Sequence, residues 1–168
     1  VCTSCHNSNF TDNFFLQYEG LITLYDEKFA TPGEKLYKAA LPLLRSDADG
    51  NHIKFSDPID FTWFELWHHE GRRARHGASM MAPDYTHWHG TYDLGKHFYS
   101  KFIPEIEEII SHGLKSSDRN DVKAAKKLQK LLTKTLKSEN HRWFLGEMDP
   151  AEKARRKKAS DEFKARYK

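Results

Sequence analysis

Two cysteines and a histidine stand together at the start of this 168-residue chain, in the order C-x-x-C-H. They are Cys2, Cys5 and His6, and the chain contains no other cysteine. In this arrangement two thiols form thioethers with the vinyl groups of a haem, and the histidine that follows binds the haem iron. A disulfide between the two cysteines is the alternative, but the adjacent histidine completes the haem signature. The motif therefore predicts one covalently attached haem c on this segment.

A second group of candidate ligands lies in the middle of the chain, where six of the ten histidines fall within thirty residues. They are His68, His69, His76, His87, His89 and His97. A haem iron with two protein ligands takes one imidazole on each face, so a histidine on a helix can bind the iron of a haem attached elsewhere. This supply exceeds what one haem needs. Arg72, Arg73 and Arg75 would then pair with haem propionates, and Glu70 would orient a ligand imidazole.

Solvent exposure and zinc binding are the alternatives to haem ligation for these histidines. Exposure requires no ligand, and we expect it for the histidines outside the strongest candidates, namely His52, His97, His112 and His141. Zinc accepts neutral imidazoles, but His68 and His69 are adjacent and have no cysteine to help them. His87 and His89 are two residues apart, which on a helix directs them to different faces.

Composition limits the class of protein. Hydrophobic residues make up 38% and charged residues 30% of the chain, which allows one domain with a modest core. The net charge of +3 gives no indication of nucleic-acid binding, and no apolar run is long enough to span a membrane. Haem is attached to thiols outside the cytoplasm. We therefore expect a periplasmic or other extracytoplasmic protein, including the anammoxosome-type lumen, and a chain that is the C-terminal piece of a longer one.

Apolar spacing predicts an all-α protein with a bundle of long helices. The expected helices cover 13–30, 34–44, 59–81, 85–113 and 120–136, with a loop at 45–58. Pro32 and Gly33 are expected to interrupt the first helical stretch, and Asp57 to cap the helix that follows the loop. We expect Pro83 to end that helix. The predicted regions are a haem-attachment segment at 1–56, a histidine-rich helical region at 57–148 and a basic tail at 149–168.

Two sets of side chains are expected in the core. Phe98, Phe102 and Ile106 lie four residues apart, which places them on one helix face. Met80 and Met81 carry thioether sulfur that can bind haem iron. We expect both methionines to pack in the core instead.

The run "HHEGRRARHGASMMAPDYTHWHGTYDLGKHFY", together with the upstream "CTSCH", resembles the C-terminal part of the hydroxylamine oxidoreductase family of octahaem c-type cytochromes. The resemblance implies the C-terminal region of a multihaem cytochrome c, with several haems per full-length chain. His89 and His76 would then be distal ligands to the iron of haems bound upstream, and His69 is a weaker candidate. Tyr85 would cross-link to the catalytic haem of a neighbouring subunit in a homotrimer, with Tyr92 as the alternative.

The function implied by this resemblance is oxidation of hydroxylamine or hydrazine, a small nitrogen substrate, at a tyrosine-cross-linked haem. Electrons would then pass through haems with two histidine ligands to a redox partner cytochrome. The expected partners also include the rest of the same multihaem chain, and exclude nucleic acid. A nitrite-reducing relative, or a monohaem or multihaem electron-transfer cytochrome c without catalysis, is the alternative.

Overall fold

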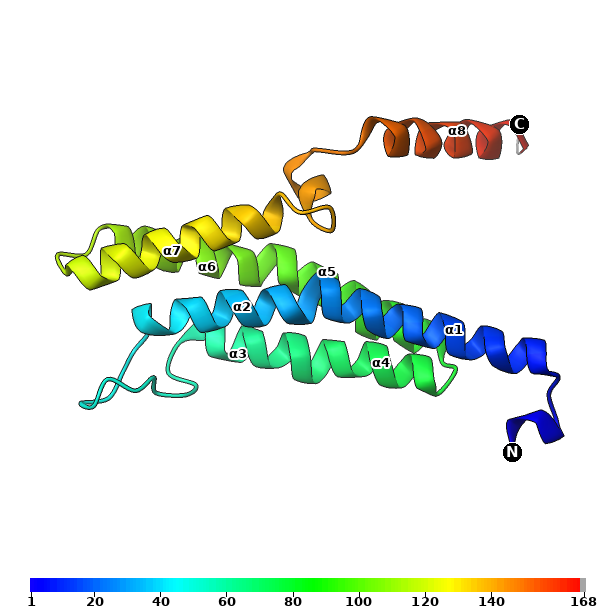
Figure 1. Ribbon diagram of the computed structural model, residues 1–168, viewed down its shortest axis with the longest axis horizontal. Coiled ribbons are helices and arrows are strands. Elements are labelled where there is room, and N and C mark those ends of the chain that lie inside the picture. Colours follow the sequence, from blue (N-terminus) through cyan, green and yellow to red (C-terminus); the bar gives the residue numbers. More distant parts are fainter. Residues whose placement is uncertain (167–168) are drawn as a thin grey trace. The chain divides into compact units, whose positions relative to one another are not determined.

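Helices supply the regular secondary structure of residues 1–166, the part of the chain that the computed structural model describes (Figure 1). No β-strand occurs in that part, so the predicted all-α class is confirmed. None of these helices combines the length and the apolar character needed to cross a membrane, as predicted. The chain divides into two compact units, Val1–Leu132 and Thr133–Lys168. The last two residues of the predicted basic tail, Tyr167 and Lys168, lie outside the described part.

The first helix is longer than predicted. It comprises α1 (Ser8–Tyr25), a π-helical segment (Asp26–Ala30), α2 (Thr31–Ala40) and a short 3₁₀ turn (Leu41–Leu43). Asn7 caps its start, because the side-chain oxygen accepts a hydrogen bond from the Phe10 N–H at 2.9 Å. The predicted break at Pro32 and Gly33 is wrong. A π turn shifts the backbone hydrogen-bond register by one residue, so a proline just after it can lack its N–H without ending the helix.

The second and third helices contain three more π-helical segments. In order they comprise α3 (Pro58–Phe64), π-helical Glu65–Glu70, α4 (Gly71–Ser79), π-helical Tyr85–Tyr92, α5 (Asp93–His97), π-helical Phe98–Phe102 and α6 (Ile103–Leu114). Asp57 is the N-cap of α3, as predicted, and has an extended backbone. Pro83 lies at the start of the third helix, after the turn that follows α4, so the predicted break there is confirmed. Pro104 follows a π segment as Pro32 does.

The last two long helices are α7 (Arg119–Leu136) and α8 (Pro150–Arg166). Most of α7 belongs to the first unit, where it approaches α6 closely: a Cβ built on Gly113 would lie 2.8 Å from the Ala125 Cβ. The second unit contains the end of α7, a 3₁₀ turn (Arg142–Leu145) and α8. No residue of α8 is buried, as expected for a strongly charged tail.

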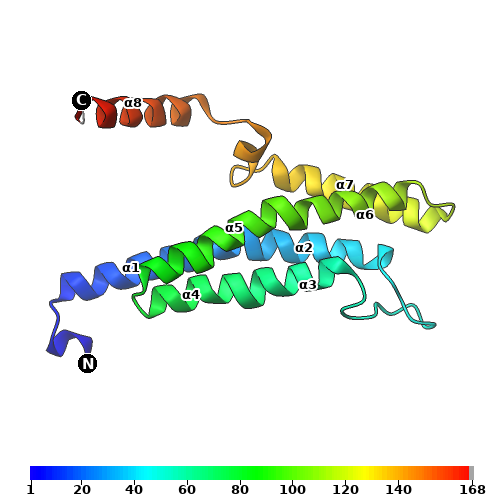
Figure 2. The ribbon, with the colours of Figure 1, turned by 180° about the vertical axis from the view of Figure 1, so that it is seen from behind.

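The core of the first unit lies between three antiparallel helices (Figures 1 and 2), and Ala125 and Leu128 of α7 are buried in this unit as well. α1 packs on α4, while α2 packs on both α3 and α6. Phe98, Phe102 and Ile106 are each 0% exposed, which confirms the predicted apolar face. Met80 and Met81 are 77% and 54% exposed, so the prediction that they pack in the core is wrong. They lie in the turn after α4, and Met81 has a positive φ of 53°.

Small residues let α4 and the Tyr85–Tyr92 segment approach closely. A Cβ added to Gly90 would lie 2.5 Å from the Ala74 Cα. A Cβ added to Gly77 would lie 2.6 Å from the Thr86 Oγ1 and 3.1 Å from its backbone nitrogen. Larger side chains at either glycine would therefore force the two backbones apart. The contact fixes the start of the third helix against the end of the second.

We predict that Gly90→Ala destabilises the protein, whereas Gly95→Ala does not. The new methyl group at position 90 would meet the Ala74 backbone, and overpacking of this kind costs roughly 1–3 kcal/mol. At Gly95, five residues further along the same helix, a Cβ meets nothing within 4 Å, and alanine is favoured over glycine in a helix by up to about 1 kcal/mol. Urea unfolding followed by circular dichroism measures both. Equal unfolding free energies for the two variants would contradict the close contact.

Candidate functional site

The C-x-x-C-H motif forms a short exposed turn before α1. Cys2–Ser4 is a 3₁₀ turn, and the backbone N–H groups of Cys5 and His6 both donate to the Cys2 carbonyl, at 3.2 and 3.0 Å. Both cysteines are free and exposed. The His6 ring is also exposed and stacks on Phe10, with ring centroids 4.6 Å apart. One turn thus presents two thiols and an imidazole to solvent, which fits covalent haem attachment followed by iron ligation.

An open groove of about 1000 Å³ lies between α1 and the helix formed by Glu65–Glu70 and α4. The second helix contributes imidazole and guanidinium groups from His68, Arg72, Arg75 and His76. His68, Arg72 and His76 are four residues apart, which places them in one row. The α1 side is mixed in character, with residues Tyr18, Glu19, Ile22 and Thr23. A groove of this volume, with apolar and cationic walls, suits a large flat ligand that carries carboxylates.

A smaller hollow of about 390 Å³ adjoins the same row of side chains. Its lining is His68, His69, Arg72, Arg73, His76 and Tyr85. Tyr85 also lies beside His89, with ring centroids 5.5 Å apart. The structure therefore gathers three of the predicted site residues, His76, Tyr85 and His89, where α4 meets the third helix. Tyr85 and His89 are exposed, and His76 is exposed as well.

Arg75 and Glu70 are held by contacts within the protein. The Arg75 Nε donates to the Gly71 carbonyl at 3.1 Å, and its guanidinium lies 4.7 Å from the centre of the Tyr25 ring. Glu70 is buried and its Oε1 lies 2.8 Å from the Nδ1 of His97. The imidazole that Glu70 orients in this structure is therefore His97, and not His76 or His89, the strongest candidate haem ligands.

Of the four histidines that are predicted to be solvent-exposed, His141 is buried, and His52 and His97 are only partly exposed. His97 has a side chain 31% exposed and bonded to Glu70. The His52 side chain is 11% exposed, and His141 is 1% exposed. His112 is exposed, as predicted. The acidic partners of His97 and His52 lie on other elements, so local composition could not reveal them.

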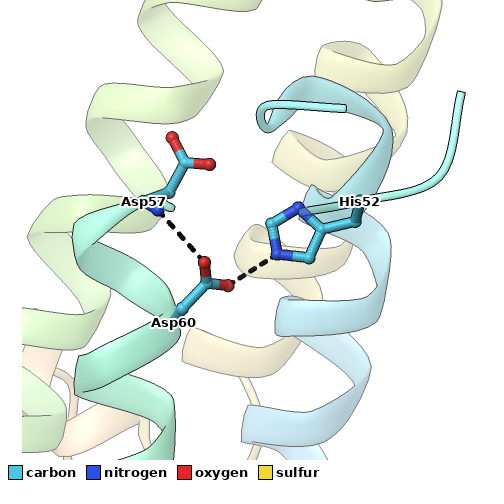
Figure 3. A group of neighbouring side chains, drawn as sticks. All are labelled: His52, Asp57 and Asp60. Carbon is cyan, nitrogen blue, oxygen red and sulfur yellow. Dashed lines mark hydrogen bonds and ion pairs between the residues drawn. The ribbon is translucent and has the colours of Figure 1, made fainter. Parts of the chain in front are cut away.

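His52 belongs to a hydrogen-bond network centred on Asp60 (Figure 3). The Asp60 carboxylate lies 2.8 Å from the His52 Nε2 and accepts from the Tyr37 hydroxyl at 2.6 Å and from the Asp57 N–H at 3.1 Å. The Ser56 N–H donates to it as well, at 3.1 Å. Asp60 is 3% exposed and its acceptor sites are well satisfied. The network therefore ties the 44–57 loop to α2 and α3.

The α1 wall of the groove was not foreseen from the sequence. Tyr18 and Ile22 are four residues apart, as are Glu19 and Thr23, so each pair lies along one side of the helix. This four-residue spacing is the one sequence signal that could have identified these residues. The same spacing occurs in every amphipathic helix, so it does not single out a groove wall. The facing row on α4 becomes apparent only in three dimensions.

Comparison of the chain with models of protein families, with curated proteins and with solved structures gives no match in any of the three. We therefore argue function from the side chains and their geometry.

We predict that Asp60→Asn destabilises the protein at pH 7, and that its effect shrinks in acid. Burial acts to raise the pKa of Asp60, but hydrogen bonds from Tyr37, the Asp57 N–H and His52 together lower it. The ionised carboxylate therefore stabilises the fold above its unfolded-state pKa of about 3.9, and this contribution is lost as the pH falls through the folded-state pKa. Loss of these hydrogen bonds costs about 1–3 kcal/mol at pH 7.

Unfolding free energies between pH 3 and pH 7 test this prediction, with Asp12→Asn as control because Asp12 is exposed on α1. A difference between Asp60→Asn and the unmodified protein that stays constant over this range would contradict it.

Proposed function

We propose that this chain is a C-terminal part of a multihaem c-type cytochrome that oxidises hydroxylamine or hydrazine, similar to the hydroxylamine oxidoreductase family. The observation that carries the proposal is the exposed turn with Cys2, Cys5 and His6. Each of the three groups that attach and ligate a haem c is accessible there. The row of imidazole and guanidinium groups along α4 adds to this support.

In this proposal Cys2 and Cys5 hold one haem c through thioether bonds, and His6 is its proximal ligand. His76 and His89 are the distal ligands to haems attached elsewhere in the full protein. Their exposure is consistent with that role, because a ligand imidazole must reach beyond the surface of its own segment. The close contact at Gly77 and Gly90, each one residue from a candidate ligand, holds both helices rigidly.

The cationic groups of the groove are proposed to bind the carboxylates of a haem rather than its iron. The Arg72 guanidinium is exposed between the groove and the smaller hollow, where it can form two parallel hydrogen bonds to a carboxylate. Arg73 lines the smaller hollow. Arg75 is less free, because it bonds to Gly71 and lies over Tyr25. We infer that Arg72 and Arg73 pair with propionates and that Arg75 supports the wall.

Tyr85 is the residue that we assign to a covalent link with the catalytic haem of a neighbouring subunit. Its side chain is 45% exposed at the start of the third helix, beside His76 and His89. An exposed phenol at this place can contact a partner subunit, which is consistent with a homotrimer. When bound, a haem with an open iron position supplies the redox chemistry, and the bis-histidine haems carry electrons to a partner cytochrome.

The proposed compartment follows from the chemistry of attachment. Thioether formation at C-x-x-C-H takes place outside the cytoplasm, so we propose a periplasmic or other extracytoplasmic location. A pure electron carrier would use the same attachment turn. An open-coordination iron distinguishes the enzyme from the carrier.

We predict that Cys5→Ser prevents stable covalent attachment of one haem, because one of the two thioether bonds is lost. His76→Ala and His89→Ala should each convert one haem from two histidine ligands to one. Expression of the intact protein in a host that attaches haem c, followed by haem quantification and electron paramagnetic resonance, measures these changes. His112→Ala is the control, since His112 is exposed and lies on α6. Unchanged haem content and ligation in all variants would overturn the proposal.

A second prediction concerns the cross-link. Tyr85→Phe should remove the red-shifted absorption of a tyrosine-linked haem after reduction, and should abolish hydroxylamine oxidation. Tyr92→Phe is the matched control, because Tyr92 is a similarly exposed phenol at the other end of the same π segment. Loss of the band in Tyr92→Phe instead of Tyr85→Phe would contradict the assignment of Tyr85.

A further inference from the structure

A cluster of acidic and histidine side chains lies between the second and third helices of the first unit, apart from the groove. Glu65, Glu70 and His97 each offer a donor atom there, and the three atoms lie within 4.8 Å of one another. Donors on opposite sides of one transition-metal ion are about 4 Å apart. The cluster is therefore close to the size that a single ion requires.

The π-helical segment explains why two of these carboxylates meet. Glu65 and Glu70 are its first and last residues. In a regular α-helix, residues five apart point about 140° away from each other. A π turn joins residues five apart through its hydrogen bonds, which brings both side chains to one face. His97 approaches from α5 on the third helix, where its Nδ1 lies 2.8 Å from the Glu70 Oε1.

One oxygen of this cluster has no hydrogen-bond donor. The Glu70 side chain is 6% exposed, and its Oε2 is buried without a partner. A buried carboxylate oxygen that lacks a donor costs free energy, which a bound cation would recover. This unpartnered oxygen distinguishes Glu70 from Asp60, whose two carboxylate oxygens both accept hydrogen bonds.

Two further charged side chains, Lys101 and Glu105, interact with Glu65 of the cluster. Lys101 forms an ion pair there, with its Nζ 3.2 Å from the Glu65 Oε2. Glu105 lies outside the cluster but is close enough to Glu65 for its charge to act on it; its Oε1 accepts a hydrogen bond from the Thr62 hydroxyl, and its Oε2 is buried without a partner. Burial raises the pKa of Glu105; the hydrogen bond from Thr62 and the charge of Lys101 act to lower it, and the charges of Glu108 and Glu65 act to raise it. A divalent cation would balance the carboxylates that Lys101 leaves uncompensated.

We propose that Glu65, Glu70 and His97 bind one divalent first-row transition-metal ion of the Mn²⁺ or Fe²⁺ class, separate from any haem. Two carboxylates and one imidazole form a mostly hard donor set, and the absence of thiolate disfavours soft ions. Ligation would bring the Glu70 Oε2 into contact with positive charge, and would pin the second helix to the third. The proposal does not depend on the haem assignment, because none of these three residues lines the groove or the smaller hollow.

Mn²⁺ is the probe that tests this site. Mn²⁺ prefers oxygen donors, so the exposed histidines of the groove compete for it less than for Zn²⁺. In the intact protein, titration followed by the loss of the free Mn²⁺ signal in electron paramagnetic resonance should give one site per chain. Mn²⁺ should also raise the midpoint of thermal unfolding. Glu70→Gln and His97→Gln should each weaken binding by about tenfold or more.

Glu107→Gln is the matched control, because Glu107 is an exposed carboxylate on α6 and lies outside the cluster. It should bind Mn²⁺ as the unmodified protein does. Glu65→Gln is the substitute if Glu70→Gln fails to fold, since the Glu65 side chain is 40% exposed and its loss disturbs the core less. Equal Mn²⁺ affinity and equal thermal shifts in all these proteins, or no binding to the unmodified protein, would overturn the proposal.

Discussion

The arrangement of the candidate site depends on one close contact between two helix backbones. Gly77 and Gly90 leave no room for a Cβ where α4 meets the Tyr85–Tyr92 segment. Since the two helix backbones cannot move closer without a clash, the backbone positions of the residues beside the contact are fixed relative to each other. His76 and His89 are each adjacent in sequence to one of these glycines. The contact thus attaches two exposed histidines to helix backbones that are held by close packing.

Secondary structure and the main apolar face were largely predictable from the sequence. The helix at 85–113 and the cap at Asp57 follow from apolar spacing and local cap chemistry, both of which are encoded nearby in the chain. Pro32 was misinterpreted because a proline normally ends a helix, and the π turn before it is a product of packing with other helices. The helix propensities of the individual residues carry no information about such a shift in the backbone hydrogen-bond register.

The candidate site was predictable in chemical type but not in its surroundings. The motif at Cys2 and the concentration of histidine and arginine between residues 68 and 97 could be recognised from residue types alone. The partial burial of His97 and His52 depends on hydrogen bonds to buried carboxylates that are 27 and 8 residues away in the sequence. Such pairings are decided by tertiary packing. The same holds for the groove, because its second wall is formed by α1, far away in the sequence.

The π-helical segments within residues 1–166 make the number of residues in these helices as important as the identity of each residue. If such a wide turn reverted to ordinary α-helical winding with the same number of residues, every later side chain on that helix would rotate by about 100°. Such a reversion in Glu65–Glu70 would turn the row on α4 away from α1 while leaving each residue type intact. Homologous chains that keep the groove should therefore either keep the wide turn or lose one residue together with it.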